Sequence, residues 1–190
     1  MKVDILLLAA GASRRMRGRD KMLELIDSET LLHRSARIAF ESKVNTVHIV
    51  TIKERILSLA DLDVDIIDAP ANQPMSNSLA MGVANINCDA VILALADMPD
   101  ITPDHYNLLI SAFDPTEPRN IWRAVSEDGK AGHPVLFPCT YFAELKQISG
   151  DQGARSVIKN NTKHVHNVKT TGRSAICDLD TPEDWQNWRK

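Results

Sequence analysis

A cluster of basic residues follows the first apolar segment of the chain. That segment ends at Gly11, and the next ten positions carry five cations, at Arg14, Arg15, Arg17, Arg19 and Lys21. Arginine offers a planar fork that suits phosphate, and lysine offers a compact point charge. The small residues before the cations would let a ligand approach the backbone, whose N–H groups could cradle phosphate oxygens. The cluster indicates a polyphosphate-binding loop, and the alternative is a solvated basic loop.

Two common phosphate-binding motifs do not occur in this segment. The GxxxxGK[ST] spacing of the P-loop is missing, and only Gly11 stands at the end of the apolar run, so no GxGxxG fingerprint is formed. The hypothesis of a phosphate site therefore depends on the charges and on residues that lie elsewhere in the chain.

Acidic residues in two distant segments could complete such a site. Asp97 follows an apolar run in "ALADMPD", and Asp178 and Asp180 lie in "CDLDTPED". Mg²⁺ usually takes one or two protein carboxylates and completes its shell with substrate phosphates and water. The alternatives are a turn at Asp97 and a helix cap at Asp180. Carboxylates facing the basic loop would supply the charges that metal-assisted phosphoryl or nucleotidyl transfer needs.

The spacing of apolar residues predicts the elements that position these charges. Short apolar or β-branched runs predict strands at 3–9, 46–51, 64–67 and 90–96. Helical spacing predicts helices at 31–40, from 76 onward, and from a cap at Thr102 to about 113. This alternation implies a parallel sheet with right-handed crossovers, which binds ligands outside the carboxyl ends of its strands.

The second half of the chain departs from this alternation. Strands are expected at 119–125 and 135–137, on either side of the turn-rich "SEDGKAGH", so a mixed or antiparallel edge is predicted. Helices at 141–147 and 154–160, a strand at 164–168 and a last helix after Thr181 complete the prediction. We expect one three-layer α/β domain over residues 1–190, with a mostly parallel sheet and a mixed edge.

Composition and charge limit the classes of function. The 190 residues are 44% hydrophobic and carry a net charge of −3, so a general nucleic-acid binder is not expected and the basic cluster is local. Cys88, Cys139 and Cys177 are scattered and odd in number, which is typical of reduced thiols in a cytoplasmic protein. The longest apolar run is too short to span a membrane, and no signal peptide is expected.

Five segments occur in an order that resembles a known family: "LAAGASRRM…K", "ALADMP", "GHPVLF", "GDQGAR" and "DLDTPEDW". Together they resemble the molybdenum cofactor cytidylyltransferases, which belong to the nucleotidyltransferase group that includes the molybdopterin guanylyltransferases. The resemblance runs over residues 8–185. It implies a Rossmann-like nucleotidyltransferase fold and transfer of CMP from CTP to molybdenum-loaded molybdopterin, forming the cytosine dinucleotide cofactor and pyrophosphate.

The resemblance also implies roles for individual residues. Arg15 and Lys21 would hold the triphosphate and stabilise developing negative charge. Asp97 would hold Mg²⁺, with Asp180 or Asp178 as a second ligand. The phosphate of molybdopterin would attack the α-phosphorus of CTP, so no protein nucleophile is required. Further nucleotide contacts are expected from Leu8, Ala9, Ala10, Gly11, Ser13, Asp68, Ser76 and Ser78.

Two residues of the later motifs are expected to contact the pterin substrate. They are His133 in "GHPVLF" and Arg155 in "GDQGAR", the latter suited to a phosphate. The alternatives are a packed histidine and a capped turn. Asp151 accompanies Arg155 in the second motif.

The chain also differs from the family pattern. Guanylyltransferases usually carry Gly-Gly where this chain has Ala10 before a single Gly11, which favours cytidine. An extra Arg17 precedes Gly18, so either Lys21 reaches the phosphates or a neighbouring arginine replaces it. In "DAPANQPMSNSL", Asp68 stands where Asn is usual, which bears on contacts to the base or ribose.

The expected partners follow from this resemblance. CTP and molybdopterin are the substrates, a target molybdoenzyme is a further partner, and neither nucleic acid nor membrane is expected to bind. We expect a cytoplasmic protein that is a monomer or a weak oligomer. The alternatives are a nucleotidyltransferase that uses GTP or another acceptor, and a non-catalytic cofactor-binding chaperone, which would not need both Lys21 and Asp97.

Overall fold

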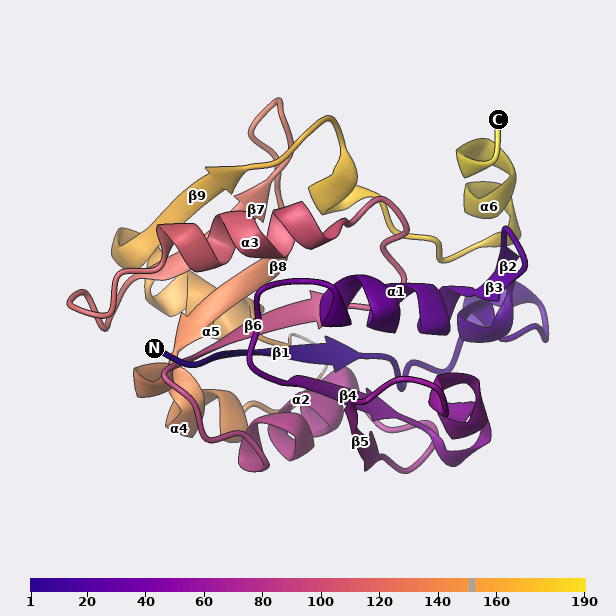
Figure 1. The fold of residues 1–190 in the computed structure, drawn as a ribbon, viewed down its shortest axis with the longest axis horizontal. Coiled ribbons are helices and arrows are strands. Elements are labelled where there is room, and N and C mark those ends of the chain that lie inside the picture. Colours follow the sequence, from indigo (N-terminus) through magenta and orange to yellow (C-terminus); the bar gives the residue numbers. More distant parts are fainter. Residues whose placement is uncertain (151–152) are drawn as a thin grey trace.

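A computed structural model describes residues 1–150 and 153–190 of the chain. Within these residues, a seven-stranded sheet has the order β5-β4-β1-β6-β8-β7-β9 (Figure 1). Its strands are β1 (Val3–Leu8), β4 (Val47–Thr51), β5 (Asp65–Asp68), β6 (Ala90–Leu95), β7 (Ile121–Val125), β8 (Ala131–Pro138) and β9 (Val165–Lys169). The α-helices are α1 (Leu31–Phe40), α2 (Met75–Ala84), α3 (Pro103–Ala112), α4 (Phe142–Lys146), α5 (Arg155–Asn160) and α6 (Pro182–Trp188).

Short elements join these helices and strands. A two-stranded hairpin is formed by β2 (Leu25–Ile26) and β3 (Glu29–Thr30). Single turns of 3₁₀-helix are found at η1 (Arg14–Met16), η2 (Lys21–Leu23), η4 (Cys139–Tyr141), η5 (Thr162–His164) and η6 (Ser174–Ile176), and a longer one is η3 (Lys53–Leu59). The sequence analysis did not predict the hairpin or η3, because both are too short to show a period.

The sheet is parallel on one side and mixed on the other. Strands β5, β4, β1 and β6 run parallel, β8 is antiparallel to both β6 and β7, and β9 is parallel to β7. The prediction of a mostly parallel sheet with a mixed edge is therefore confirmed. Strand β8 is longer than predicted, because it forms a ladder with two neighbours at once.

Two apolar layers pack against the two faces of the sheet. Alternate residues of β1 point to opposite faces: Ile5 and Leu7 join the core under α1 and α3, and Leu6 and Leu8 join the core with α2, α4 and α5. In Figure 1, α1 and α3 lie in front of the sheet and α5 lies behind it. Both faces of β1 are buried, which explains why its sequence is an unbroken apolar run.

The register of the parallel strands sets which loops meet. Leu8 pairs with Leu95 of β6, and Thr51 at the end of β4 pairs with Asp68 of β5. The segments that follow β1 and β6 therefore leave the sheet at the same edge, as is expected of neighbouring parallel strands. These are the basic residues after Gly11 and the acidic residue Asp97.

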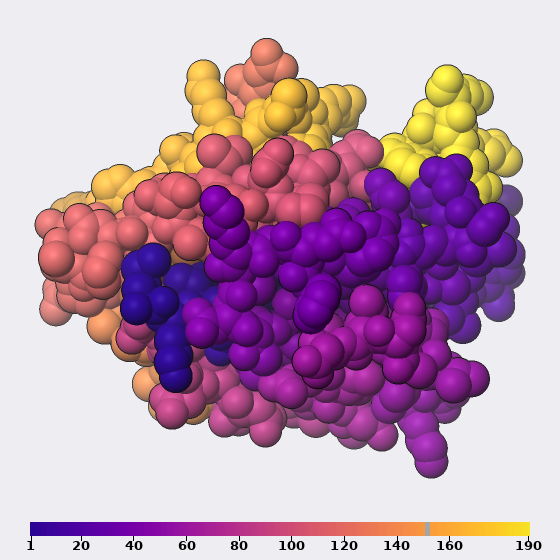
Figure 2. Space-filling view, viewed as in Figure 1, coloured from indigo at the N-terminus to yellow at the C-terminus, as the bar shows by residue number. Residues whose placement is uncertain are grey.

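The last helix brings a third segment to this edge. Its N-cap is Thr181, whose side chain accepts a hydrogen bond from the Asp184 N–H, while the Asp184 carboxylate accepts from the Thr181 N–H at 2.8 Å. The interpretation of Asp180 as the cap is therefore wrong, because the capping box starts one residue later. Arg189 of the segment after α6 donates to the Leu25 carbonyl, and Figure 2 shows the C-terminal segment beside the residues of the first hairpin.

Among the described residues, no helix combines the length and the apolar composition that crossing a bilayer requires.

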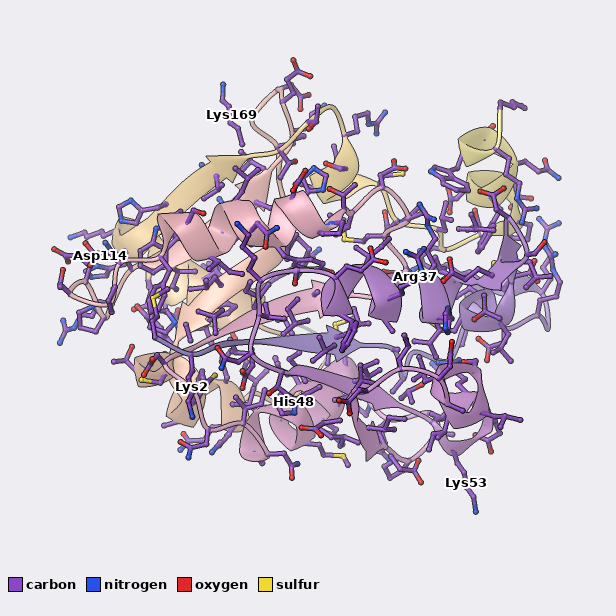
Figure 3. The ribbon with its side chains drawn as sticks, viewed as in Figure 1. Lys2, Arg37, His48, Lys53, Asp114 and Lys169 are labelled. Carbon is purple, nitrogen blue, oxygen red and sulfur yellow. The ribbon has the colours of Figure 1, made fainter. Side chains whose placement is uncertain are left out.

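A cluster of charges attaches the first hairpin to α1. Glu29 accepts from Nε and Nη2 of Arg37, both at 2.9 Å, and pairs with His33 Nδ1 at 2.6 Å. Arg37, labelled in Figure 3, also donates to Glu41 at 2.8 Å. The hydrogen bonds from Arg37 are the main reason why the pKa of Glu29 falls to about 2. A bidentate arginine–carboxylate pair of this kind has a fixed geometry.

We predict that Glu29→Gln makes stability less dependent on pH. A lowered folded-state pKa means that Glu29 stabilises the protein fully above its unfolded value near 4.5, and that this contribution is lost as the pH falls through about 2. At pH 7 the variant should lose about 1–2 kcal/mol of unfolding free energy in urea titrations. The control Glu41→Gln, which removes an exposed contact, should change stability by no more than about 0.5 kcal/mol. Equal losses for both variants would contradict this assignment.

Candidate active site

A buried lysine joins the basic loop, residues 9–21, to the two acidic segments. Lys21 Nζ lies 2.5 Å from Asp97 Oδ2 and 2.6 Å from Asp180 Oδ1, and its side chain is only 9% exposed. Arg15 Nη2 contacts the other oxygen of Asp180 at 2.5 Å. Segments that are 76 and 159 residues apart in the sequence thus meet at one ammonium group. The alternative of a wholly solvated basic loop is wrong.

The pKa shifts follow from these contacts. Burial alone would lower the pKa of Lys21, but the charges and hydrogen bonds of Asp97 and Asp180 outweigh it and hold the pKa above its usual value. Burial would raise the pKa of Asp180, yet Lys21 and then Arg15 keep it below its usual value. Burial, followed by the repulsion of Asp180 and Asp97, raises the pKa of Asp178. Lys21 and Asp180 are therefore charged at neutral pH, and Asp178 is the carboxyl that most readily keeps a proton.

Short local hydrogen bonds hold Lys21 in place. Asp20 caps η2 by accepting from the Met22 N–H at 3.0 Å, and it also accepts from Ser13 Oγ at 3.2 Å. Ser13 Oγ in turn accepts from the Lys21 N–H at 3.2 Å. The two ends of the segment that contains the extra residue are thus joined directly.

The extra residue Arg17 is accommodated on the outside of the loop. Arg17 adopts a left-handed conformation with φ 53°, and Nη2 of its side chain reaches outward to Glu183 at 2.5 Å. Arg19 pairs with Glu24 at 3.2 Å and does not take the position of the lysine. Lys21 is therefore the cation that faces the acidic residues.

The first cavity at this edge lies directly over the basic loop. It has a volume of about 100 Å³ and is lined by Leu8, Ala9, Ala10, Gly11, Lys21, Met22, Gln73, Met75, Ser78, Leu95 and Asp97. A Cβ added to Gly11 would have no atom within 4 Å, so the backbone at this point is open to an approaching molecule. Among the described residues, nothing accepts a hydrogen bond from the N–H groups of Ala10, Gly11, Ala12 and Ser13. These N–H groups, with Lys21, can bind an anion.

The second cavity adjoins the first and is larger and mostly apolar. Its volume is about 380 Å³, and it shares Leu8, Met75 and Leu95 with the first cavity. Its polar lining includes His133, Arg155 and Asp178. The pKa of His133 is lowered, chiefly by burial, so its ring is neutral at pH 7. Asp151, which accompanies Arg155 in the sequence motif, lies outside the described residues.

Some residues expected to contact a nucleotide lie elsewhere. Asp68 is exposed at the end of β5, and Ser76 is fully buried in α2, and neither lines the two cavities described above. The Ser13 side chain contacts Asp20 and Lys21 instead of facing the first cavity. Ser78 does line the first cavity.

The sequence analysis did not single out Arg55, which the structure places behind the basic loop. Its side chain is 2% exposed and donates to the carbonyl oxygens of Ala9 and Gly11 and to the carboxylate of Asp20. The only sequence signal is its spacing between Ile52 and Leu59, where an apolar residue would be expected. That spacing is compatible with an exposed arginine as well as with a buried one.

Two of the acidic residues fit a divalent metal ion. The described residues contain no group of three or more acidic, histidine or cysteine side chains placed to hold one. Two carboxylates do converge, at Asp97 and Asp180, and the buried Oδ1 of Asp97 has no hydrogen-bond partner within the described part of the chain. Two carboxylates with a free oxygen fit Mg²⁺, whose remaining ligands come from substrate and water.

We predict that Lys21→Met raises the pKa of Asp180. Without the ammonium group, burial raises the pKa of Asp180 against only Arg15 and the hydrogen bond with Asp178. Carbon-13 NMR titration of the aspartate carboxyl groups measures the change directly. The control is Lys130→Met, because Lys130 pairs with the exposed Asp128 outside this site. An unchanged titration of Asp180 in the Lys21 variant would show that the contact does not govern its charge.

Sequence comparisons relate the chain to proteins of known families. A family model described as the MobA-like NTP transferase domain matches residues 5–168. The purine catabolism protein PucB of Bacillus subtilis (strain 168) is 28% identical over 207 residues, and the match covers 96% of this chain and 94% of PucB.

Solved structures share the fold over nearly the whole chain. Rv0371c from Mycobacterium tuberculosis H37Rv is 24% identical with a TM-score of 0.85, covering 99% of this chain and 98% of that one. The same protein was solved in complex with manganese, at 23% identity, a TM-score of 0.81, and 98% and 97% coverage. A nucleotidyl transferase from Methanothermobacter thermautotroptrophicus is 17% identical with a TM-score of 0.85, covering 99% and 96%. The predicted Rossmann-like nucleotidyltransferase fold is thus confirmed.

Proposed function

Because the chain belongs to the MobA-like NTP transferase family, we propose that it transfers CMP from CTP to molybdenum-loaded molybdopterin and releases pyrophosphate. Nucleotidyl transfer itself follows from the family, and the proposal concerns the nucleotide and the acceptor. The observation that carries it is the position of Lys21, Asp97 and Asp180. These side chains lie where a small cavity with free N–H groups adjoins a larger apolar cavity.

The basic loop would bind the triphosphate. Within the described residues the N–H groups of Ala10 and Gly11 have no acceptor, and they would donate to phosphate oxygens in the cavity that Lys21 also lines. The N–H groups of Ala12 and Ser13 follow directly in the loop. Two carboxylates hold the Lys21 ammonium group at this cavity. A triphosphate that binds there would therefore reach the ammonium group without a movement of the backbone. Arg15, whose side chain is 68% exposed, can turn from Asp180 toward the same phosphates. Both cations would then stabilise the negative charge that develops on the leaving pyrophosphate.

Asp97 and Asp180 would hold Mg²⁺. When bound there, the metal would offset the charge of the triphosphate and polarise the reacting phosphate. The manganese complex of Rv0371c, which shares the fold, supports a divalent metal for this chain. Asp178 is better suited to donate a hydrogen bond to Asp180 than to bind the metal, because its pKa is raised.

The larger cavity would bind the acceptor. Its apolar lining suits a flat heterocycle, and Arg155 suits a phosphate group on that heterocycle. A phosphate monoester is already anionic at neutral pH, with a second pKa near 6, so it can attack the α-phosphorus without a protein base. The protein therefore needs to supply neither a nucleophile nor a base. The site only has to position two phosphate groups and screen their charge.

The choice of CTP depends on the volume at Ala10. Ala10 is 7% exposed and lines the first cavity, where its methyl group reduces the space available to a base. A pyrimidine needs less space than a purine. The Gln73 side chain at the same cavity, which accepts from Asn77 at 2.7 Å, can offer hydrogen bonds to the edge of a base.

The test is an incubation of the protein with Mg²⁺, molybdenum-loaded molybdopterin and radiolabelled CTP or GTP. We expect label in the cofactor from CTP. Incorporation from GTP alone would overturn the choice of base, and no incorporation from either would favour a non-catalytic carrier or another acceptor. Asp97→Asn should lower turnover by at least about 10²-fold and abolish Mn²⁺ binding measured by electron paramagnetic resonance, while the protein stays folded. Asp114→Asn, an exposed aspartate labelled in Figure 3, is the matched control and should behave as wild type.

We also predict that Gly11→Ala weakens nucleotide binding without unfolding the protein. The added methyl group meets no atom within 4 Å, and Gly11 does not adopt a left-handed conformation, so stability should change by less than about 1 kcal/mol. The methyl group would stand where phosphate approaches the backbone. The Kd for CTP, measured by calorimetry, should rise about tenfold. Unchanged affinity would show that the phosphates do not approach the loop at Gly11.

A further inference from the structure

One buried guanidinium contacts three groups of the basic loop. Arg55 of η3 donates from Nη1 to the Ala9 carbonyl, from Nη2 to the Gly11 carbonyl at 2.9 Å, and from Nε to Asp20 Oδ2 at 2.7 Å. Its side chain is 2% exposed. Lys53, two residues earlier on the same element, is exposed and projects away from the protein in Figure 3. Arg55 therefore does not serve as a surface charge of η3.

The two carbonyl contacts determine which way the neighbouring N–H groups point. In a planar trans peptide, the C=O of one residue and the N–H of the next point in opposite directions. Because the Ala9 and Gly11 carbonyls face Arg55, the N–H groups of Ala10 and Ala12 face away from it. Within the described part of the chain, these two N–H groups have no hydrogen-bond acceptor. Arg55 thus binds the carbonyl groups on one side of the loop, and the N–H groups that follow them point to the opposite side.

The third contact connects the beginning and the end of the loop. Asp20, which pairs with Nε of Arg55, also accepts from Ser13 Oγ and caps the turn that carries Lys21. A lysine at position 55 could not make all three contacts, since its donors lie on a single nitrogen atom instead of a planar fork. The three contacts therefore require the geometry of arginine, and not only its charge.

We propose that Arg55 is a positioning residue for the nucleotide: it orients the peptide groups that follow Ala9 and Gly11 so that the N–H groups of Ala10 and Ala12 face the triphosphate. Arg55 acts from behind the loop and does not itself contact the nucleotide. This inference rests on the proposed function in that it takes the bound anion to be the triphosphate of a nucleotide. It adds to that function a residue that ties the loop to η3.

The experiment compares Arg55→Met and Arg55→Lys with the matched control Lys53→Met, which removes the same charge from the same element. Calorimetric titration with CTP should show at least about tenfold weaker binding for both Arg55 variants, and a change below about twofold for the control. Amide hydrogen exchange should accelerate in the Arg55 variants, relative to β1, at Met16 and Met22, whose N–H groups are hydrogen-bonded to Ser13 and Asp20 of the loop. A purely structural role would instead lower the melting temperature and speed exchange in β1 and the loop alike, with unchanged affinity of the folded protein.

The outcomes separate this inference from the proposed function. If wild type binds neither CTP nor GTP, the proposed function fails, and the exchange rates at Met16 and Met22 still decide whether Arg55 orders the loop. If wild type binds CTP and both Arg55 variants bind it equally well, the positioning role is overturned. Should Arg55→Met not fold, Asp20→Asn removes only the ion pair and keeps the carbonyl contacts. It should weaken CTP binding less than Arg55→Lys does, and an equal or larger loss would count against the role of the carbonyl contacts.

Discussion

The contact of Lys21 with Asp97 and Asp180 is the interaction on which the candidate active site depends. An isolated ammonium group that is only 9% exposed would be costly, and its two carboxylates remove that cost by hydrogen bonding to it directly. With Arg15 on the second oxygen of Asp180, two cations and two carboxylates balance in charge. Removing Lys21 would take away the ion-pair partner of Asp97, which is 16% exposed, and would leave Asp180 with Arg15. The segments around residues 15–21, 97 and 180 are therefore energetically interdependent.

The sequence could predict the part of this site that follows from strand geometry. Asp97 and the basic loop each follow an apolar run, and neighbouring parallel strands leave a sheet at the same edge, so their proximity could be inferred from β1 and β6 alone. The place of Asp180 could not be inferred in this way. It depends on the chain returning to that edge and on Thr181 taking the cap of α6, which frees the Asp180 carboxylate for Lys21 and Arg15. Asp and Thr both favour the N-cap position of a helix, so the sequence does not distinguish Asp180 from Thr181 as the cap of α6.

Arg55 shows why a residue that supports the binding loop from behind is harder to infer from the sequence. Whether an arginine is buried depends on partners that lie far away in the sequence, here two backbone carbonyl groups and Asp20, and carbonyl groups are common to every residue. No pattern of side-chain types marks them. The same limit applies to Asp68 and Ser76, whose sequence positions matched a nucleotide motif although neither residue lines the two cavities. Asp68 is exposed and Ser76 is fully buried, and the residue types alone do not indicate this difference.

The two cavities differ in what they are made of, and this difference bears on specificity. Under the proposed function, the smaller cavity would bind the triphosphate through Lys21 and through backbone N–H groups that Arg55 orients. Ala10 and Gly11 would act there through the volume they leave. The larger cavity is lined mainly by apolar side chains, with His133 of β8, Arg155 of α5 and Asp178 of the segment before α6 among them. Leu8, Met75 and Leu95 line both cavities and so form the boundary between them. Under the proposed function, residues that line only one cavity would change triphosphate binding or acceptor choice separately, while the reacting phosphates would meet beside Lys21.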